Sequence, residues 1–226
     1  MGMVVLCTKK KIKMRFTLLA FDLEHTGYQR KGGACVPIQC AWQCRIFDSD
    51  KKSSYHPIIR NRQFVICGAK QINRSAPLHP RFTVKYVNQV GCSLAYVLRI
   101  LIQDMKASEN LIMLGASLLQ DFQNMLRGMG ESKLKQELVY LLVNTPMFCI
   151  QKELPSRYVG RVGLKHLYSF FTGDKGAQKE GHDAFEDVHL TMKIYLEGIE
   201  QGFYETPPTI YQKKETRYKV LLESLL

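Results

Sequence analysis

The chain has 226 residues, of which 46% are hydrophobic and 10% aromatic, and it carries a formal net charge of +12 at pH 7. This length suits one sizeable domain, and this composition excludes an intrinsically disordered protein. No apolar stretch approaches the roughly 20 residues that a membrane-spanning helix needs, so we expect no association with a membrane. The first apolar residues are too few for a signal peptide, and lysines follow them instead of preceding them. We therefore expect an intracellular protein, cytoplasmic or nuclear.

The positive charge is unevenly distributed along the chain. Residues 25–103 contain twelve Lys or Arg and only two acidic residues, Asp48 and Asp50, whereas residues 104–226 contain fifteen basic and sixteen acidic residues. A basic segment of this size predicts a polyanionic partner such as nucleic acid. The alternative, that these side chains only keep the protein in solution, would lead us to expect acidic residues interspersed among them.

Three strands and a helix are predicted in the first half of the chain. Residues 15–24 form an apolar run, residues 36–47 alternate and then become apolar, and residues 63–70 form a shorter strand. Residues 48–62 are polar and contain a proline, which indicates a loop. Residues 90–105 place apolar side chains on one face at helical spacing, which predicts a long helix.

Helices and strands alternate in the second half. Residues 110–117 predict a strand that leads directly into a helix over residues 118–130. Residues 139–150 are apolar and rich in strand-forming residues, and a proline among them limits any helix. Residues 163–173 and 182–202 predict two further helices, and the rest of the chain predicts a tail or an appended helix. Three opening strands followed by alternating elements predict an α/β domain with a mixed sheet covered by helices.

Four acidic residues stand out by their positions. Asp22 and Glu24 end the first predicted strand, and side chains two residues apart leave the same face of a strand. Two ionised carboxylates that close repel each other unless a cation lies between them. Asp121 and Asp187 fall in the first turns of predicted helices, where open α/β sheets bind their ligands. A solvated or capping role is the alternative for each of these two.

The seven cysteines are scattered through apolar surroundings, and there is no CxxC motif. Cys40 and Cys44 flank the single tryptophan, Trp42, which could suggest a zinc site. Because the sequence offers no second ligand pair at a suitable spacing, we expect buried, reduced thiols.

Three motifs carry a resemblance to a known family. The segments FDLEHTG (residues 21–27), LIMLGASLLQDFQNM (111–125) and GHDAFEDVHLTMKIY (181–195) resemble, in this order, the motifs of the DEDDh group of DnaQ-like 3′–5′ exonucleases. Within the group, the chain is most similar to the RNA exonucleases of the interferon-stimulated and Rex types. The resemblance implies an α/β fold with a ribonuclease H-like mixed β-sheet flanked by helices. It divides the chain into a basic arm (1–15), an exonuclease domain (16–203) and a tail or appended helix (204–226).

The resemblance also implies a reaction, the hydrolysis of single-stranded RNA or DNA from its 3′ end to nucleoside 5′-monophosphates. Two divalent cations, Mg²⁺ or Mn²⁺, would be held by Asp22, Glu24, Asp121 and Asp187. His182 would act as the general base, because an unperturbed histidine can accept a proton from water at neutral pH.

Substrate contacts are expected in two places. The resemblance implies that the chain at Leu23, His25 and Thr26 lines the terminal nucleotide. Long basic side chains in or beside the predicted loops of the acid-free segment, residues 51–103, are expected to contact phosphates. These are Arg60, Arg62, Lys70, Arg74 and Arg81.

Two other functions stay open at this point. One is a catalytically silent module that only binds nucleic acid, which would be expected to have lost at least one of the four carboxylates. The other is a proofreading or repair DNA exonuclease subunit that acts with a polymerase. The choice between RNA and DNA depends on contacts to the 2′-hydroxyl, which the sequence does not reveal.

Overall fold

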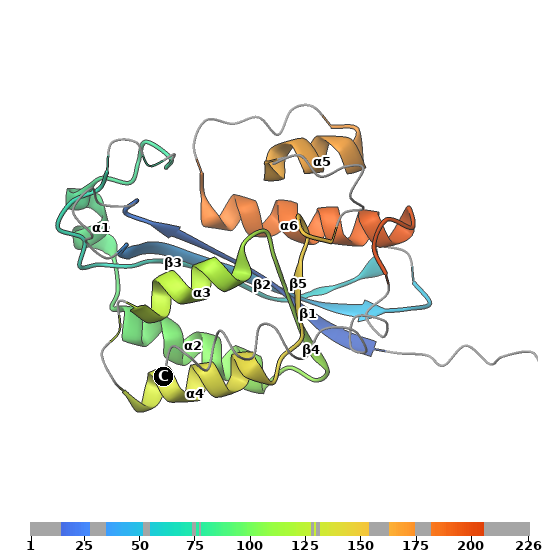
Figure 1. Cartoon of the computed structure of the whole chain (residues 1–226), viewed down its shortest axis with the longest axis horizontal. Coiled ribbons are helices and arrows are strands. Elements are labelled where there is room, and N and C mark those ends of the chain that lie inside the picture. The colour runs from blue at the N-terminus through green and yellow to red at the C-terminus, as the bar shows by residue number, and fades with distance from the viewer. Residues whose placement is uncertain are drawn as a thin grey trace, which may run out of the picture.

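A mixed five-stranded β-sheet forms the centre of the computed structural model (Figure 1). The structure describes residues 15–27, 35–51, 55–73, 76, 78–127, 129, 132–153, 163–174 and 182–205. The order of the strands is β3-β2-β1-β4-β5. β2 pairs antiparallel with β1 and β3, whereas β4 pairs parallel with β1 and β5. The strands are β1 (Arg15–His25), β2 (Pro37–Asp48), β3 (Ile58–Val65), β4 (Leu111–Gly115) and β5 (Met147–Cys149).

Helices cover both faces of the sheet, which gives an α/β fold of three layers. One hydrophobic cluster joins the sheet to α2 (Leu94–Lys106), α3 (Leu118–Arg127) and α4 (Lys133–Val143). A second cluster joins the other face to α5 (Leu164–Thr172) and α6 (Ala184–Glu200). Figure 1 shows α2, α3 and α4 below the sheet, α5 and α6 above it, and the short helix α1 (Val84–Val90) beside one end. The predicted fold class is confirmed.

The alternation of side chains along β1 determines which face carries the acidic residues. Leu19, Phe21 and Leu23 pack in the cluster with α2, α3 and α4, whereas Leu18 and Ala20 pack in the cluster with α5 and α6. Because the side-chain period of a strand is two residues, Asp22 and Glu24 belong to the face that α6 covers.

Most of the predicted elements are confirmed, and three differ. The predicted strand 63–70 is displaced, because the observed strand β3 ends at Val65. The predicted loop over residues 48–62 is wrong in its second half, because β3 begins at Ile58. β3 is an edge strand whose side chains are mostly half-buried or exposed, so it has no apolar alternation to reveal it. The predicted strand-like segment 139–150 is split between the end of α4 and the short β5. Helix α1 and the first turns of α4 were not predicted.

Several predictions concern residues that the structure does not describe. The predicted basic arm (1–15) and the predicted tail or appended helix (204–226) lie outside the described residues, except for Arg15, which begins β1, and residues 204–205. Among the described cysteines, all six are free, as expected for reduced thiols. In the part of the chain that the structure describes, no helix has the length and apolar character needed to cross a membrane.

Candidate active site

All four predicted acidic residues and His182 line one cleft, with a volume of about 470 Å³. They come from three separate segments: the end of β1, the first turn of α3 and the start of α6. The structure thus brings together the residues that the sequence analysis selected as metal ligands and general base.

The sheet topology places these segments at the same end. β1 and β4 run parallel, so the carboxyl end of β4 and the helix that follows it lie next to the end of β1. Gly115 closes β4 at a point where a Cβ atom would come within 2.5 Å of the Leu118 side chain and 3.1 Å of the Phe21 carbonyl oxygen. A glycine therefore allows α3 to start close to β1, with Asp121 in its first turn.

His182 and two carboxylates form the closest group in the cleft. His182 Nδ1 lies 3.3 Å from Asp187 Oδ2 and 4.0 Å from Glu24 Oε1. The side chain of His182 is half exposed, whereas Glu24 and Asp187 are buried. These three residues offer ligand atoms that all lie within 4.8 Å of one another.

Burial and mutual repulsion raise the pKa values of three carboxylates in the cleft. Burial raises the pKa of Asp22 well above its usual value, and the charges of Asp121 and Glu24 raise it further. Burial also raises the pKa of Glu24 to about 7 and that of Asp121 well above its usual value. For His182, the hydrogen bond with Asp187 raises the pKa above the usual 6.5.

The residues of the cleft fit a divalent cation. Asp121 Oδ2 is buried and has no hydrogen-bond partner among the described residues, so an acceptor oxygen in the cleft lacks a donor. Buried polar oxygens are normally satisfied, and an orphaned carboxylate oxygen is costly unless positive charge compensates it. The ligand set is made of oxygen atoms from aspartate and glutamate, the ligands that Mg²⁺ and Mn²⁺ prefer.

The three residues predicted to contact the terminal nucleotide are placed differently. Leu23 and His25 line the cleft, whereas Thr26 is buried beside it and does not line it. Thr26 instead holds the chain after β1 in place: Val36 N–H donates to its Oγ1 at 3.1 Å, and Asn73 N–H donates to its carbonyl oxygen at 2.8 Å.

The basic residues predicted to contact phosphates do not form one group around the cleft. Arg60 and Arg62 lie within β3, not in loops, and their Nε atoms are 3.1 and 3.2 Å from the carboxylate of Asp104 in α2. They pair with Cys44 and Trp42 of β2, so their side chains leave the sheet face opposite to Asp22 and Glu24. Lys70 is exposed and Arg81 forms an ion pair with Asp183, while Arg74 lies outside the described residues.

Sequence reasoning missed several residues of the site. Asn73 and Gln151 line the cleft from loops whose position only the fold determines. Asp183 was also missed, although the sequence carries a signal for it. It directly precedes an amphipathic helix, and its side chain caps α6 by accepting the Phe185 N–H at 3.0 Å.

Comparisons with known proteins bear on this architecture. No family model matches the chain, and no curated protein matches it. Solved structures do match: Escherichia coli exonuclease I in complex with a dA16 oligonucleotide has a TM-score of 0.57 at 15% identity, over 87% of this chain and 42% of that chain. The fold is similar to that of exonuclease I. The chain thus spans about two fifths of the length of exonuclease I.

Two further structures repeat this likeness. The zinc-bound form of the E. coli exonuclease I complex with single-stranded DNA has a TM-score of 0.57 at 15% identity, over 87% of this chain and 42% of that chain. A 3′-exonuclease that recognises the 3′ end of the histone mRNA stem-loop has a TM-score of 0.54 at 13% identity, over 83% of both chains. The match to the second protein therefore extends over most of its length.

Proposed function

We propose that this protein is a metal-dependent 3′–5′ exonuclease of the DEDDh type that hydrolyses single-stranded nucleic acid to nucleoside 5′-monophosphates. The observation that carries the proposal is the convergence of Asp22, Glu24, Asp121, Asp187 and His182 in one cleft. Four carboxylates from three elements repel one another, so the fold keeps them together at a cost in stability that a metal site explains.

The carboxylates would hold two cations. Glu24 and Asp187, which lie closest together with His182, would hold one cation with Asp22, and Asp22 and Asp121 would hold the second. Bound Mg²⁺ or Mn²⁺ would lower the pKa of a water molecule and stabilise the negative charge of the reacting phosphate. In that state the carboxylates are ionised, because cation binding replaces the protons that burial favours.

His182 would move the proton. With Nδ1–H donated to Asp187, Nε2 is the nitrogen that can accept a proton from the attacking water. The water oxygen bonds to the last phosphorus atom, and the bond from that phosphorus to the 3′ oxygen of the preceding nucleotide breaks. The products are a nucleoside 5′-monophosphate and a chain that is one unit shorter and ends in a 3′-hydroxyl.

Two observations support a nucleic-acid substrate, and a third favours catalysis over binding alone. The fold is shared with exonuclease I, crystallised with a dA16 oligonucleotide, and with a 3′-exonuclease that recognises the 3′ end of the histone mRNA stem-loop. The formal charge of +12 favours a polyanion. A module that only binds nucleic acid would have no need to keep four mutually repelling carboxylates, and this chain retains all four.

Digestion of RNA and DNA oligonucleotides labelled at the 5′ end tests this function. With Mg²⁺ or Mn²⁺, we expect a ladder that shortens progressively from the 3′ end, blocked by a terminal 3′-phosphate. Asp187→Asn should remove the activity, whereas Glu109→Gln, which removes an exposed charge outside the cleft, should not. Rapid cleavage of a circular single strand would contradict an exonuclease, and the absence of any cleavage with either metal would contradict a nuclease.

A further inference from the structure

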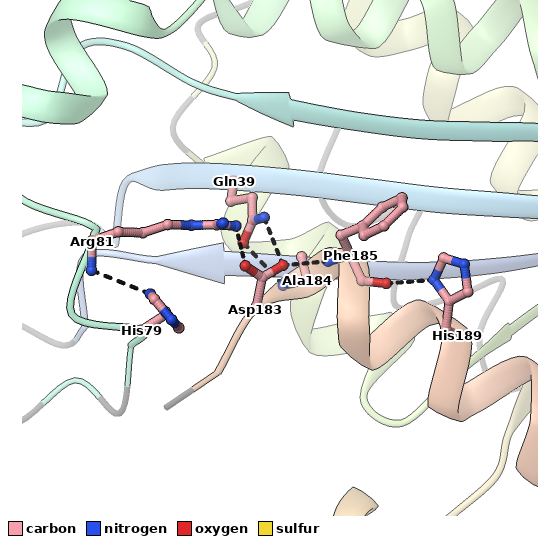
Figure 2. A network of polar contacts seen from close by, with 7 residues as sticks. All are labelled: Gln39, His79, Arg81, Asp183, Ala184, Phe185 and His189. Atoms are coloured by element: carbon pink, nitrogen blue, oxygen red, sulfur yellow. Dashed lines mark hydrogen bonds and ion pairs between the residues drawn. The ribbon is translucent and has the colours of Figure 1, made fainter. Parts of the chain in front are cut away.

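A polar network holds the residue that follows His182 (Figure 2). Asp183 Oδ2 accepts a hydrogen bond from Arg81 Nη2, which also forms an ion pair with it. Asp183 Oδ1 accepts from Gln39 Nε2 at 3.0 Å, and Gln39 Oε1 in turn accepts the Ala184 N–H at 2.9 Å. Gln39 is fully buried and Asp183 is 5% exposed, so each contact replaces water that the side chains have lost.

The backbone of His182 is held by the same loop that carries Arg81. The His79 N–H donates to the carbonyl oxygen of His182 at 3.0 Å, and Leu78 forms an isolated parallel β-bridge with His182. Figure 2 shows Arg81 reaching from this loop to Asp183, with Gln39 approaching from β2. The position of His182 is thus held by the hydrogen bond to its own carbonyl oxygen and by the contacts of the next residue, Asp183.

The backbone of His182 needs this support because it lies outside helix α6. The helix begins at Ala184 with Asp183 as its N-cap, so His182 lies before the first helical hydrogen bond. The contact with Asp187 orients its half-exposed ring, but this contact does not hold the backbone from which the ring extends. A general base must be held within a fraction of an ångström of its working position.

We propose that Arg81 and Gln39 are positioning residues that hold His182, through Asp183, in the geometry that the reaction needs. The inference rests on the proposed nuclease function. It gives Arg81 a role different from a phosphate contact, because its guanidinium is already committed to Asp183 and lies over the Phe82 ring, 4.9 Å from its centroid. The two roles predict different kinetics.

A double-mutant cycle distinguishes the positioning role of Arg81 from a phosphate contact. Asp183→Asn keeps Oδ1, which caps α6, but places an amide group against Arg81 and so removes the ion pair. If Arg81 acts through Asp183, Arg81→Ala and Asp183→Asn each lower kcat by up to about 100-fold at unchanged KM. The double variant is then no slower than the slower single variant. Losses that multiply in the double variant would overturn the proposal.

Binding measurements test the alternative role of Arg81, that of a phosphate contact. In an Asp22→Asn background, Arg81→Ala should leave the salt dependence of single-strand binding unchanged. A slope lower by about 0.7 on a log–log scale would assign Arg81 to a phosphate and overturn the positioning role. Arg81→Lys, which retains the charge, should recover much of kcat. Arg99→Ala, which removes an exposed arginine from α2, is the matched control and should change neither quantity.

Amide hydrogen exchange tests the network without any substrate. In Arg81→Ala, the amides of His79 and Ala184, whose acceptors belong to this network, should exchange faster than in the wild type or in Arg99→Ala. Unchanged exchange at both amides would overturn the proposal even if the protein is an active nuclease. Faster exchange in a protein that cleaves no nucleic acid would contradict the proposed function and leave the network itself confirmed.

Discussion

His182 Nδ1 lies 3.3 Å from Asp187 Oδ2, although the two residues are five positions apart and only Asp187 belongs to α6. This contact joins a half-exposed ring to a buried carboxylate at the mouth of the cleft. It orients the ring and raises the pKa of His182. The relationship therefore links the proposed general base directly to a proposed metal ligand.

Removal of the general base should separate proton transfer from metal binding. We expect His182→Ala to lower kcat by roughly 10²–10⁴-fold, the usual contribution of a positioned proton acceptor. Mn²⁺ affinity, measured by titration calorimetry, should change far less, because His182 is not assigned as a ligand. In the wild type the rate should fall at acidic pH as His182 is protonated. A variant with the wild-type rate between pH 6 and 9 would exclude His182 as the base.

Neutralising a carboxylate should abolish activity while stabilising the metal-free protein. Asp22→Asn and Asp121→Asn each remove one charge from a buried group of like charges, so the melting temperature in a chelator at pH 8 should rise. Nuclease activity in Mg²⁺ should be lost in both variants. Glu109→Gln, at an exposed position outside the cleft, should affect neither property. Lower melting temperatures for both cleft variants would contradict the repulsion that we infer.

The metal-free protein should become less stable as pH rises through the titration of Glu24. Its pKa is about 7 in the folded protein against 4.5 for an unperturbed glutamate. The folded state therefore holds the proton more tightly, and stability is lost between these two values, by at most about 3 kcal/mol. Denaturant melts at pH 5 and pH 8 measure this difference, which Mg²⁺ should reduce at pH 8. If Glu24→Gln shows the same pH dependence, Glu24 is not the group responsible.

Asp104 should matter for stability and not for chemistry. Its carboxylate is 8% exposed, forms ion pairs with Arg60 and Arg62, and accepts a hydrogen bond from Trp42 Nε1 at 2.9 Å. Asp104→Ala leaves these donors without their acceptor, so we expect a loss of about 3 kcal/mol in the free energy of unfolding. The kcat of the folded variant should stay close to that of the wild type, because Asp104 lies on the sheet face opposite to the cleft.

Arg60 and Arg62 can be tested separately as phosphate contacts. As partners of Asp104, their joint replacement by alanine should lower stability and leave the salt dependence of single-strand binding unchanged. As phosphate contacts, each loss should reduce the log–log slope by about 0.7. Their position on the sheet face opposite to the cleft favours the first result. If each arginine replacement reduces the salt-dependence slope, the bound nucleic acid must extend around the edge of the sheet at β3.

The site could be predicted because its residues carry local patterns. Asp22 and Glu24 interrupt an apolar strand, and Asp121 and Asp187 each follow a strand or a loop at the start of a helix. The network around His182 could not be predicted in this way. Gln39, Arg81 and Asp183 meet only because β2 and the loop after residue 76 pass the start of α6, and 144 positions separate Gln39 from Asp183. Such contacts depend on tertiary packing, which the periodicity of apolar residues in the sequence does not reveal.

The error at β3 has a related cause. Residues 58–62 are two adjacent isoleucines followed by three polar residues, so they show no alternation that would indicate a strand. A polar run of this kind favours a loop as long as the partner of its arginines is unknown. That partner, Asp104, lies on α2 and is 42 positions away from Arg62. Because this contact could not be predicted, Arg60 and Arg62 were expected to be free to bind phosphates, although both pair with Asp104 within the fold.

The central claim is that the cleft binds divalent cations through its four carboxylates. Anomalous diffraction from crystals of the full chain grown with Mn²⁺ tests it most directly. We predict anomalous peaks within coordination distance of Asp22, Glu24 and Asp187, with Asp121 beside the second ion, and the loss of these peaks in Asp22→Asn. A cleft without any anomalous peak at millimolar Mn²⁺, with the carboxylates in the same positions, would contradict the account.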